Sequence, residues 1–210
     1  MNRANQALQT LERYKARLDD VSTALSALEV GDLVTVRDVA GVLQRNEMVR
    51  RIAEEIDGYI VELGADARLV RLQLDELMGD VEDDRYAVMH DYLCEGEGHD
   101  TEHAVHELAA LGTDDLLDVR QVASLLCLPQ GARDLDRGLT PKGYRLLARV
   151  PRLPSAVIDR IVRQFGSLPK IMRATIEDLD MVEGVGEARA VAIKEGLSRL
   201  AETSILDRYS

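Results

Sequence analysis

Aromatic and cysteine residues are scarce in this chain. Among 210 residues there is no Trp and one Phe, Phe165, and aromatic residues make up only 3% of the total. Proteins that bind single-stranded nucleic acid usually stack bases on exposed rings, so this composition disfavours that class. The two cysteines, Cys94 and Cys127, are too few for a disulfide framework or a cysteine zinc site, as is typical of a reducing cytosol.

Long apolar runs are also missing. The longest, residues 122–128, contains Ser124 and is far shorter than a membrane-spanning helix requires. Residues 1–6 contain no apolar signal core. We therefore expect a cytoplasmic protein with no membrane association. With 46% hydrophobic residues, the chain has enough apolar side chains to form one or two globular domains.

The net charge of −12 argues against nucleic-acid binding until it is divided by segment. Residues 75–118 hold fifteen acidic residues and one basic residue, Arg85. Residues 139–200 hold eleven basic and seven acidic residues, a balance of +4. The basic surplus therefore lies in the C-terminal segment, where it could contact phosphates, whereas the acidic block would repel DNA. A solvated charged surface without a ligand is the alternative.

Residues 179–194 predict a helix-hairpin-helix motif that holds a phosphate. Gly184 and Gly186 flank Val185 between two helical patterns, and glycine allows the positive φ that brings backbone N–H groups close to a ligand. We expect all three residues to present backbone donors. The helix that follows points its positive N-terminal end the same way, and Arg189 and Lys194 add charge off its apolar face. A purely structural turn is the alternative interpretation.

An internal repeat supports a second hairpin. Shifting the chain by 32 positions places seven apolar residues of 147–168 on seven apolar residues of 179–200, as in repeats that bury their faces against each other. The first copy has Pro154 where the second has Gly186, and proline has no N–H to offer a phosphate. We expect the second hairpin to hold the DNA backbone more directly, while the first supplies charge. The cations that extend this predicted footprint are Arg149, Arg152 and Lys142.

The N-terminal half predicts a helical bundle. Apolar residues spaced seven apart predict a long amphipathic helix over residues 3–29. Thr35 is positioned to cap a second helix that Gly58 ends, and a third helix follows at about residues 66–78. We call the apolar residues spaced seven apart the heptad seam. The favoured interpretation is that this seam packs against other helices of the same chain, so that the helices form a rigid spacer. The alternative is that the seam binds a coiled-coil partner.

From residue 79 to residue 113 the helical spacing of apolar residues becomes irregular, and acidic residues and glycines are frequent. This composition indicates an acidic connector with one short helix at 100–111. All four histidines lie here, and three could share a helical face beside Cys94 with a spacing that suits zinc or nickel. Solvated histidines are the favoured interpretation, so no metal site is predicted. We expect another helix at 114–128, ended by residues 129–131. The three histidines are His99, His103 and His106.

These patterns predict an all-α fold in two parts. A helical linker, or spine, occupies residues 1–138, and a tandem helix-hairpin-helix DNA-binding domain occupies residues 139–210. No helix presents a row of side chains suited to base edges, so we expect contact with the backbone of duplex or branched DNA. The alternative is an adaptor that dimerises through residues 8–28 and binds protein. Catalysis by Asp180 and Glu183 is disfavoured, because neither has a basic or metal partner in the pattern.

Four stretches of the chain resemble the DisA family of DNA integrity scanning proteins. They are residues 4–15 (ANQALQTLERYK), 143–147 (GYRLL), 151–154 (PRLP) and 182–189 (VEGVGEAR). The resemblance covers essentially the whole chain. It implies a bacterial protein of DNA damage and repair, with an N-terminal diadenylate cyclase domain, a helical spine, and a tandem hairpin domain that binds DNA, including Holliday junctions.

The cyclase domain implied by this resemblance would join two ATP molecules into cyclic di-AMP, with Mg or Mn. Its Asp-Gly-Ala and Arg-His-Arg motifs are absent from this sequence. We therefore expect no cofactor and no catalytic residue in this chain, which is similar to the part of the family that follows the cyclase. The resemblance implies DNA as a partner. It also implies either self-association or binding to a separate cyclase domain. Without the family's oligomer we expect weak, salt-sensitive DNA binding.

Overall fold

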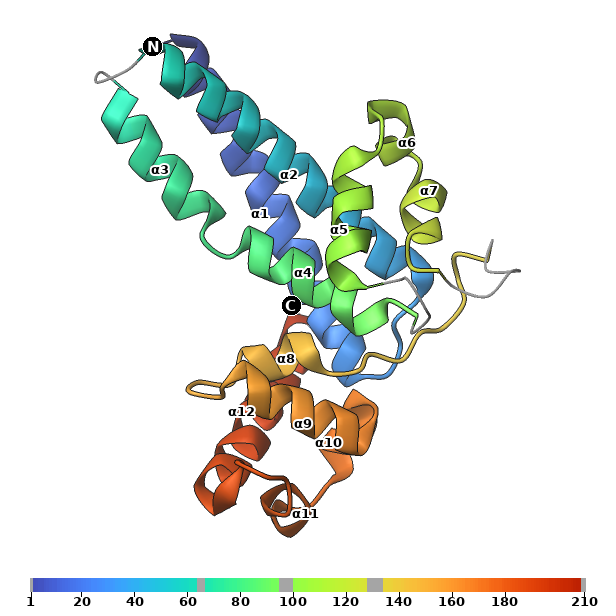
Figure 1. The fold of residues 1–210 in the computed structure, drawn as a ribbon. Coiled ribbons are helices and arrows are strands. Elements are labelled where there is room, and N and C mark those ends of the chain that lie inside the picture. Colours follow the sequence, from blue (N-terminus) through green and yellow to red (C-terminus); the bar gives the residue numbers. More distant parts are fainter. Residues whose placement is uncertain (1, 64–66, 95–99, 128–133, 209–210) are drawn as a thin grey trace.

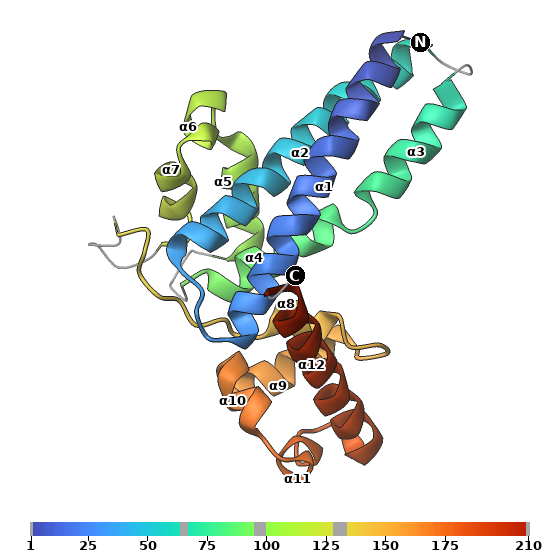
Figure 2. The ribbon, with the colours of Figure 1, turned by 180° about the vertical axis from the view of Figure 1, so that it is seen from behind.

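The structure is a computed structural model that describes residues 2–63, 67–94, 100–127 and 134–208. The elements formed by these residues are α-helices, with no β-strand among them and one isolated bridge between Thr35 and Gly138. Figures 1 and 2 show a long helical spine standing on a smaller C-terminal helical domain. The predicted all-α fold is therefore confirmed. Within the described ranges, no helix has the length and apolarity needed to cross a membrane.

The spine is formed by three helices, α1 (Asn2–Val30), α2 (Val36–Leu63) and α3 (Arg68–Met78). α1 and α2 run antiparallel side by side, and α3 returns along them (Figures 1 and 2). Leu11, Leu18 and Leu25 of the predicted heptad seam are each at most 2% exposed. The seam therefore packs within the chain, as expected, and is not free for a coiled-coil partner.

The boundaries of α2 follow the prediction at one end only. Thr35 precedes the helix, and its N–H donates to Asp38 Oδ2 (2.9 Å) while Asp38 N–H donates to Thr35 Oγ1 (3.4 Å). This is a reciprocal cap of the first turn. The predicted end at Gly58 is wrong, because α2 continues to Leu63. Ile56 and Ile60 are buried on either side of the glycine, so tertiary packing outweighs its low helix propensity.

Four shorter helices follow the spine: α4 (Val81–Tyr92), α5 (Thr101–Ala110), α6 (Thr113–Leu117) and α7 (Val119–Ser124). The sequence predicts a connector here, yet α4 and α5 pack into the main core, where Val88 and Leu108 are fully buried. α5 agrees with the short helix predicted at 100–111, whereas α4 was not predicted. The single helix predicted for 114–128 is instead divided at Asp118 and ends early, at Ser124; the residues 129–131 that were predicted to end it lie outside the described residues.

The histidines that the structure describes are not gathered into a metal site. Over the part of the chain that the structure describes, no group of three His, Cys, Asp or Glu side chains could hold a metal ion. His103 Nε2 lies 3.5 Å from Glu107, and His90 Nδ1 shares a 2.7 Å hydrogen bond with Thr101 Oγ1. His99 lies outside the described residues.

The C-terminal domain, which we call the hairpin domain, contains α8 (Tyr144–Ala148), α9 (Ser155–Phe165), α10 (Leu168–Arg173), α11 (Ile176–Asp180) and α12 (Gly186–Arg208). Its buried core runs from Leu146 to Leu197, separate from the main core between Ala4 and Leu135. Every residue pair of the 32-residue repeat belongs to this second core or packs against it. The repeat therefore reflects two hairpins, α8–α9 and α11–α12, that bury their apolar faces together.

Candidate nucleic-acid interface

The turn of the second hairpin has the geometry that its glycines predict. Gly184 has φ 86° and Gly186 has φ 65°, both in the left-handed region. Both glycines are exposed, whereas Val185 is 3% exposed and anchors the turn in the core. Val185 N–H donates to Val182 O (3.0 Å), so the structure uses this predicted donor inside the turn. The described residues offer no partner to the N–H groups of Gly184 and Gly186.

The turn leads directly into α12, a helix of 23 residues that begins at Gly186. The first N–H groups of a helix lack intrahelical partners, and the helix dipole gives this end a positive potential. The N-terminal end of α12 can therefore bind an anion such as a DNA phosphate. Glu187 is exposed in the first turn of the same helix, so an approaching phosphate also meets one carboxylate.

Two arginines brace this turn through its carbonyl groups. Arg160 Nη1 donates to Glu183 O (3.0 Å), and Arg189 Nη1 donates to Gly184 O (2.5 Å). Both arginines are exposed, so their charge remains near the surface of the turn. A Cβ on Gly184 would lie 3.0 Å from Arg160 Nη1. Arg160 comes from α9 of the first hairpin, and no pattern in the sequence connects it to this turn.

The first hairpin forms a related turn without glycine. Arg152, which stands 32 positions before Gly184, has φ 61° and is exposed. A left-handed conformation is unusual for a residue with a Cβ, so the packing of the two hairpins sets it. Pro154 precedes α9 with φ −66° and offers no N–H, as predicted. The first turn therefore contributes the Arg152 side chain and fewer backbone donors.

Two predicted cations, Lys194 and Lys142, bind carbonyl groups within the fold. Lys194 Nζ donates to Met172 O (2.6 Å) and Ala174 O (2.8 Å), at the C-terminal end of α10. Lys142 Nζ donates to the carbonyl oxygens of His90 (3.3 Å) and Leu93 (3.0 Å), at the end of α4. Carbonyl groups at helix ends lack intrahelical donors, which explains both contacts. These two lysines are therefore not gathered with Arg189 at the turn.

Arg149 lies on the side of the hairpin domain that faces the spine. Its Nη1 donates to Ser26 Oγ of α1 (3.0 Å), and its Nη2 lies 3.7 Å from Asp84 of α4. Its side chain remains 38% exposed, in contrast to the neighbouring Arg145. The structure therefore places Arg149 at the contact between the two domains and not at either hairpin turn.

A buried arginine joins the hairpin domain to the spine. Arg145 of α8 donates to Glu29 Oε2 (2.7 Å) and Asp84 Oδ1 (2.9 Å), and also to both oxygens of Ser22. The Arg145 side chain is 1% exposed and Glu29 is fully buried. Burial raises the pKa of Glu29 to about 7, although Arg145 and Tyr92 favour its charged form.

Asp91 of α4 makes the second polar connection between the domains. Its carboxylate accepts the N–H groups of Gly143 (2.8 Å), Tyr144 (2.7 Å) and Arg145 (3.0 Å), which caps the start of α8. Burial raises the pKa of Asp91 to about 6, against the opposite effect of these three hydrogen bonds. Together with Arg145, this cap holds the hairpin domain in one orientation on the spine.

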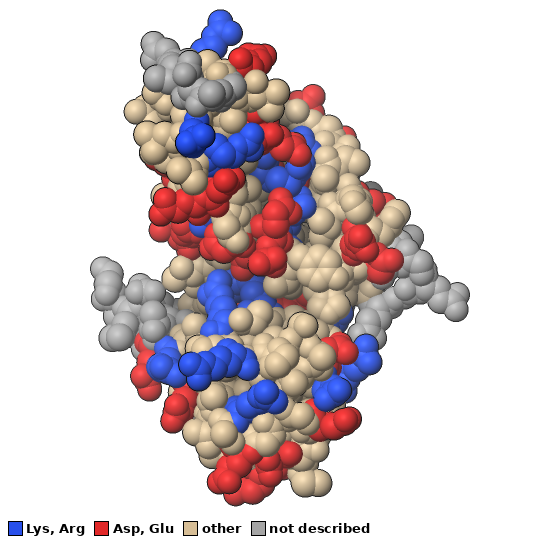
Figure 3. Space-filling view, turned by 60° about the vertical axis from the view of Figure 1, so that its left-hand side comes forward, with Lys and Arg blue, Asp and Glu red and all other residues tan. Residues whose placement is uncertain are grey.

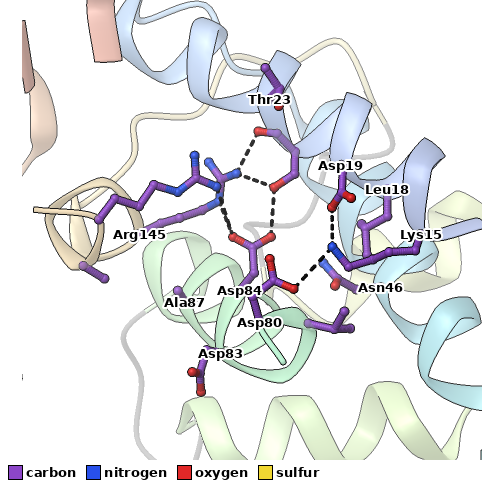
Figure 4. Close-up of a pocket in the computed structure, with 14 residues that line it drawn as sticks. Lys15, Leu18, Asp19, Thr23, Asn46, Asp80, Asp83, Asp84, Ala87 and Arg145 are labelled. Atoms are coloured by element: carbon purple, nitrogen blue, oxygen red, sulfur yellow. Dashed lines mark hydrogen bonds and ion pairs between the residues drawn. The ribbon is translucent and has the colours of Figure 1, made fainter. Parts of the chain in front are cut away.

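A pocket of about 460 Å³ opens beside these connections, between α1, α4 and α8 (Figure 4). Lys15 bridges Asp19 (2.5 Å) and Asp80 (3.3 Å) on one wall, and Arg145 lies on the opposite wall. Asn46 is fully buried beside Lys15, and neither end of its amide finds a partner in the described residues. The mixed charges largely neutralise one another, so this pocket does not extend a phosphate footprint.

On the face shown in Figure 3, the surface charges follow the division counted along the sequence only in part. A band of basic side chains lies below the junction of spine and hairpin domain, but further basic patches lie on the upper part of the molecule, and acidic side chains gather between these and also at the lower tip. The three exposed cations at the two turns are Arg152, Arg160 and Arg189.

Comparison with known proteins agrees with this architecture. A family model described as "DisA bacterial checkpoint controller linker region" matches residues 1–135, which form the spine and the helices that follow it. The curated relatives include proteins named "DNA integrity scanning protein DisA" from Kineococcus radiotolerans, 60% identical over 210 residues, and from Frankia alni, 56% identical over 210 residues. Another is the protein of that name from Streptomyces avermitilis, 56% identical over 212 residues.

In each comparison the whole of this chain is matched. The match covers 58% of the Kineococcus and Frankia proteins and 57% of the Streptomyces protein, so the chain spans little more than half of its curated relatives. The linker model matches more than half of this chain, and the relatives match all of it. The chain therefore belongs to the DisA family.

Proposed function

We propose that the hairpin domain binds duplex or branched DNA, such as a Holliday junction, through backbone phosphates and without reading sequence. The observation that carries this proposal is the exposed turn with Gly184 and Gly186, whose N–H groups have no partner in the described part of the chain and lie at the start of α12. In this proposal the chain is the DNA-sensing portion of a DisA protein.

The charged side chains around the turn support the same chemistry. Arg160 and Arg189 each use one nitrogen on a carbonyl of the turn and have further N–H donors on an exposed guanidinium. They can therefore shape the turn and contact a phosphate together. Arg152 adds an exposed cation at the first hairpin. The lack of Trp and the single Phe favour backbone contact over base stacking.

We further propose that this chain has no catalytic activity of its own. Asp180 and Glu183 are exposed near the turn, and neither side chain forms an ion pair within the described residues. In the proposed full protein, synthesis of cyclic di-AMP from ATP, with Mg or Mn, belongs to a cyclase domain outside this chain. The adaptor alternative is weakened, since the seam it needs is buried by the chain's own helices.

Fluorescence anisotropy with a labelled four-way junction and a matched duplex tests the proposal. The intact chain is compared with Gly184→Asp and with Arg189→Glu, each first checked for its helical circular dichroism. We expect both variants to bind at least about tenfold more weakly at low salt, because each opposes the phosphate directly. Arg120→Glu is the matched control, since it makes the same charge change on α7, away from the hairpins (Figure 1).

Unchanged affinity in both folded variants would contradict the assignment of the turn. A salt titration adds an independent measurement, because each neutralised phosphate contributes about 0.9 to the slope of log affinity against log salt. With three exposed cations at the turns, we expect a slope of about −3 on duplex DNA. Affinity that stays constant between low and physiological salt would rule out phosphate binding.

A further inference from the structure

A second surface of the protein lies between α4 and the first hairpin. It is a groove of about 570 Å³ between the outer face of α4 and the helices α8 and α9. Neither the buried Arg145 connection nor the turn of the second hairpin lines it. The groove is therefore separate from the proposed phosphate site, and what binds in it is a separate question.

The walls of the groove are apolar and shaped by small side chains. Ala87, Ala148 and Ala156 line it, and the buried Ile158 forms part of its floor. Aromatic rings complete one wall: Tyr86 stacks on His90 at 5.9 Å between ring centroids, and His90 lies 3.9 Å from the Tyr144 ring. Tyr86 is 47% exposed, so its ring presents apolar surface to a ligand in the groove. The groove thus offers an aromatic wall, with the Tyr86 ring stacked on His90 and the Tyr144 ring tilted against it, beside small residues.

The charge at the edge of the groove is negative. Asp83 lines it from the first turn of α4, is exposed, and has no ion pair within the described residues. Asp159 lines the other side, where it accepts a hydrogen bond from Tyr144 and pairs with Arg163 (3.1 Å). Asp83 also borders the neighbouring polar pocket, where Asp80 pairs with Lys15 and Asp84 pairs with Arg145.

This charge selects the occupant. A nucleic-acid strand in the groove would bring its phosphates against Asp83 and the acidic start of α4, which is unfavourable. A cationic side chain would gain from the same carboxylates, while an aromatic or branched apolar side chain fills the space beside Tyr86. A short peptide that carries both, next to each other, satisfies both parts of the surface.

We propose that this groove docks a peptide segment of a partner protein, with an aromatic or branched apolar side chain between Tyr86 and Ala156 and an adjacent Lys or Arg paired with Asp83. Peptides use grooves of this kind through one buried anchor and a few polar contacts. The interaction does not rest on DNA binding, since it uses a different surface of the hairpin domain. A protein docked here stands next to the first hairpin and leaves the second turn open.

The test is a titration of the ¹⁵N-labelled chain, followed by NMR chemical shifts. The probe is the capped peptide acetyl-Gly-Phe-Arg-Gly-amide, compared with acetyl-Gly-Phe-Glu-Gly-amide and with an oligothymidylate. We expect the Phe-Arg peptide to shift the amide signals of Tyr86, Ala87 and Ala156 in a saturable way. The Phe-Glu peptide should shift them at least about tenfold more weakly, and the oligothymidylate should leave them unchanged.

Two variants make the result specific. Ala156→Trp fills the groove at an exposed position of α9 and should abolish the shifts, while Asp83→Lys should invert the preference toward the Phe-Glu peptide. Asp114→Lys on α6 is the matched control for charge and should behave as the intact chain. The proposal is overturned if the Phe-Arg peptide leaves these signals unchanged, if both peptides bind equally, or if the oligothymidylate occupies the groove instead.

Discussion

Replacing Arg145 with methionine removes the cation that connects the hairpin domain to the spine. The Arg145 side chain is 1% exposed and donates to Glu29, which is fully buried, at 2.7 Å. Methionine keeps much of the apolar stem but leaves the Glu29 carboxylate without its charge partner. Breaking a buried ion pair on one side costs about 3–5 kcal/mol. We therefore expect Arg145→Met to lower the free energy of unfolding by that amount at pH 8.

The same reasoning predicts that the loss depends on pH. Burial already raises the pKa of Glu29 to about 7 with Arg145 present, and removing Arg145 raises it further. At pH 5.5 the isolated Glu29 takes up a proton and no longer carries an unpaired charge, so the variant recovers part of the loss. Urea denaturation at both pH values, followed by circular dichroism, measures the difference.

Arg45→Met on the exposed face of α2 is the control for the loss of one positive charge. A loss below about 1 kcal/mol at pH 8 for Arg145→Met would refute the assigned role of the buried pair. An equal loss at pH 8 and pH 5.5 would leave Arg145 important but refute the account based on the Glu29 carboxylate.

Three further changes are expected to alter stability, each measured by urea denaturation. Asn46→Leu should raise the free energy of unfolding by about 1–3 kcal/mol, because it removes a buried amide that has no partner among the residues the structure describes; a decrease would show that the amide is satisfied. Glu29→Gln should flatten the pH dependence. The raised pKa of Glu29 means that the folded chain holds an extra proton between about pH 4.5 and 7, so the Glu29 contribution falls as pH rises, and an unchanged profile in Glu29→Gln would contradict this. Gly143→Ala should cost roughly 1–3 kcal/mol, because φ is +117° and the new Cβ would lie 3.1 Å from Ile171 Cδ1; a neutral result would contradict the strain.

The two hairpins could be predicted from the sequence because their signals are local. Each buried position of the repeat recurs at helical spacing, and a glycine pair marks the second turn. The two hairpin turns are more alike than the apolar repeat indicates, because Arg152 adopts the same left-handed conformation as Gly184 although it is not glycine. Sequence periodicity detects which residues share a core, whereas it does not report that the packing forces a non-glycine residue into this conformation.

α4 could not be predicted because its buried polar residues find their partners far along the chain. Asp91 accepts N–H groups of α8, more than 50 positions away, and Arg85 pairs with Glu47 of α2 at 2.7 Å. In the sequence alone these residues extend a run of acidic and polar residues, which is typical of a connector. Only the folded chain neutralises them and allows Val88 to be buried beside them.

The predicted DNA-binding residues show why a charge count overstates a binding footprint. The eleven basic residues of 139–200 include Lys142, Arg145 and Lys194, which the structure commits to helix ends and to the spine. A cation at a helix C-terminus or a domain contact looks the same in sequence as a cation on DNA. The structure distinguishes these three cations from DNA-binding ones by their hydrogen-bond acceptors, which are carbonyl and carboxylate oxygens of the chain itself. The proposed footprint therefore contracts to the two hairpin turns, where arginines remain exposed and the N–H groups of Gly184 and Gly186 have no partner among the described residues.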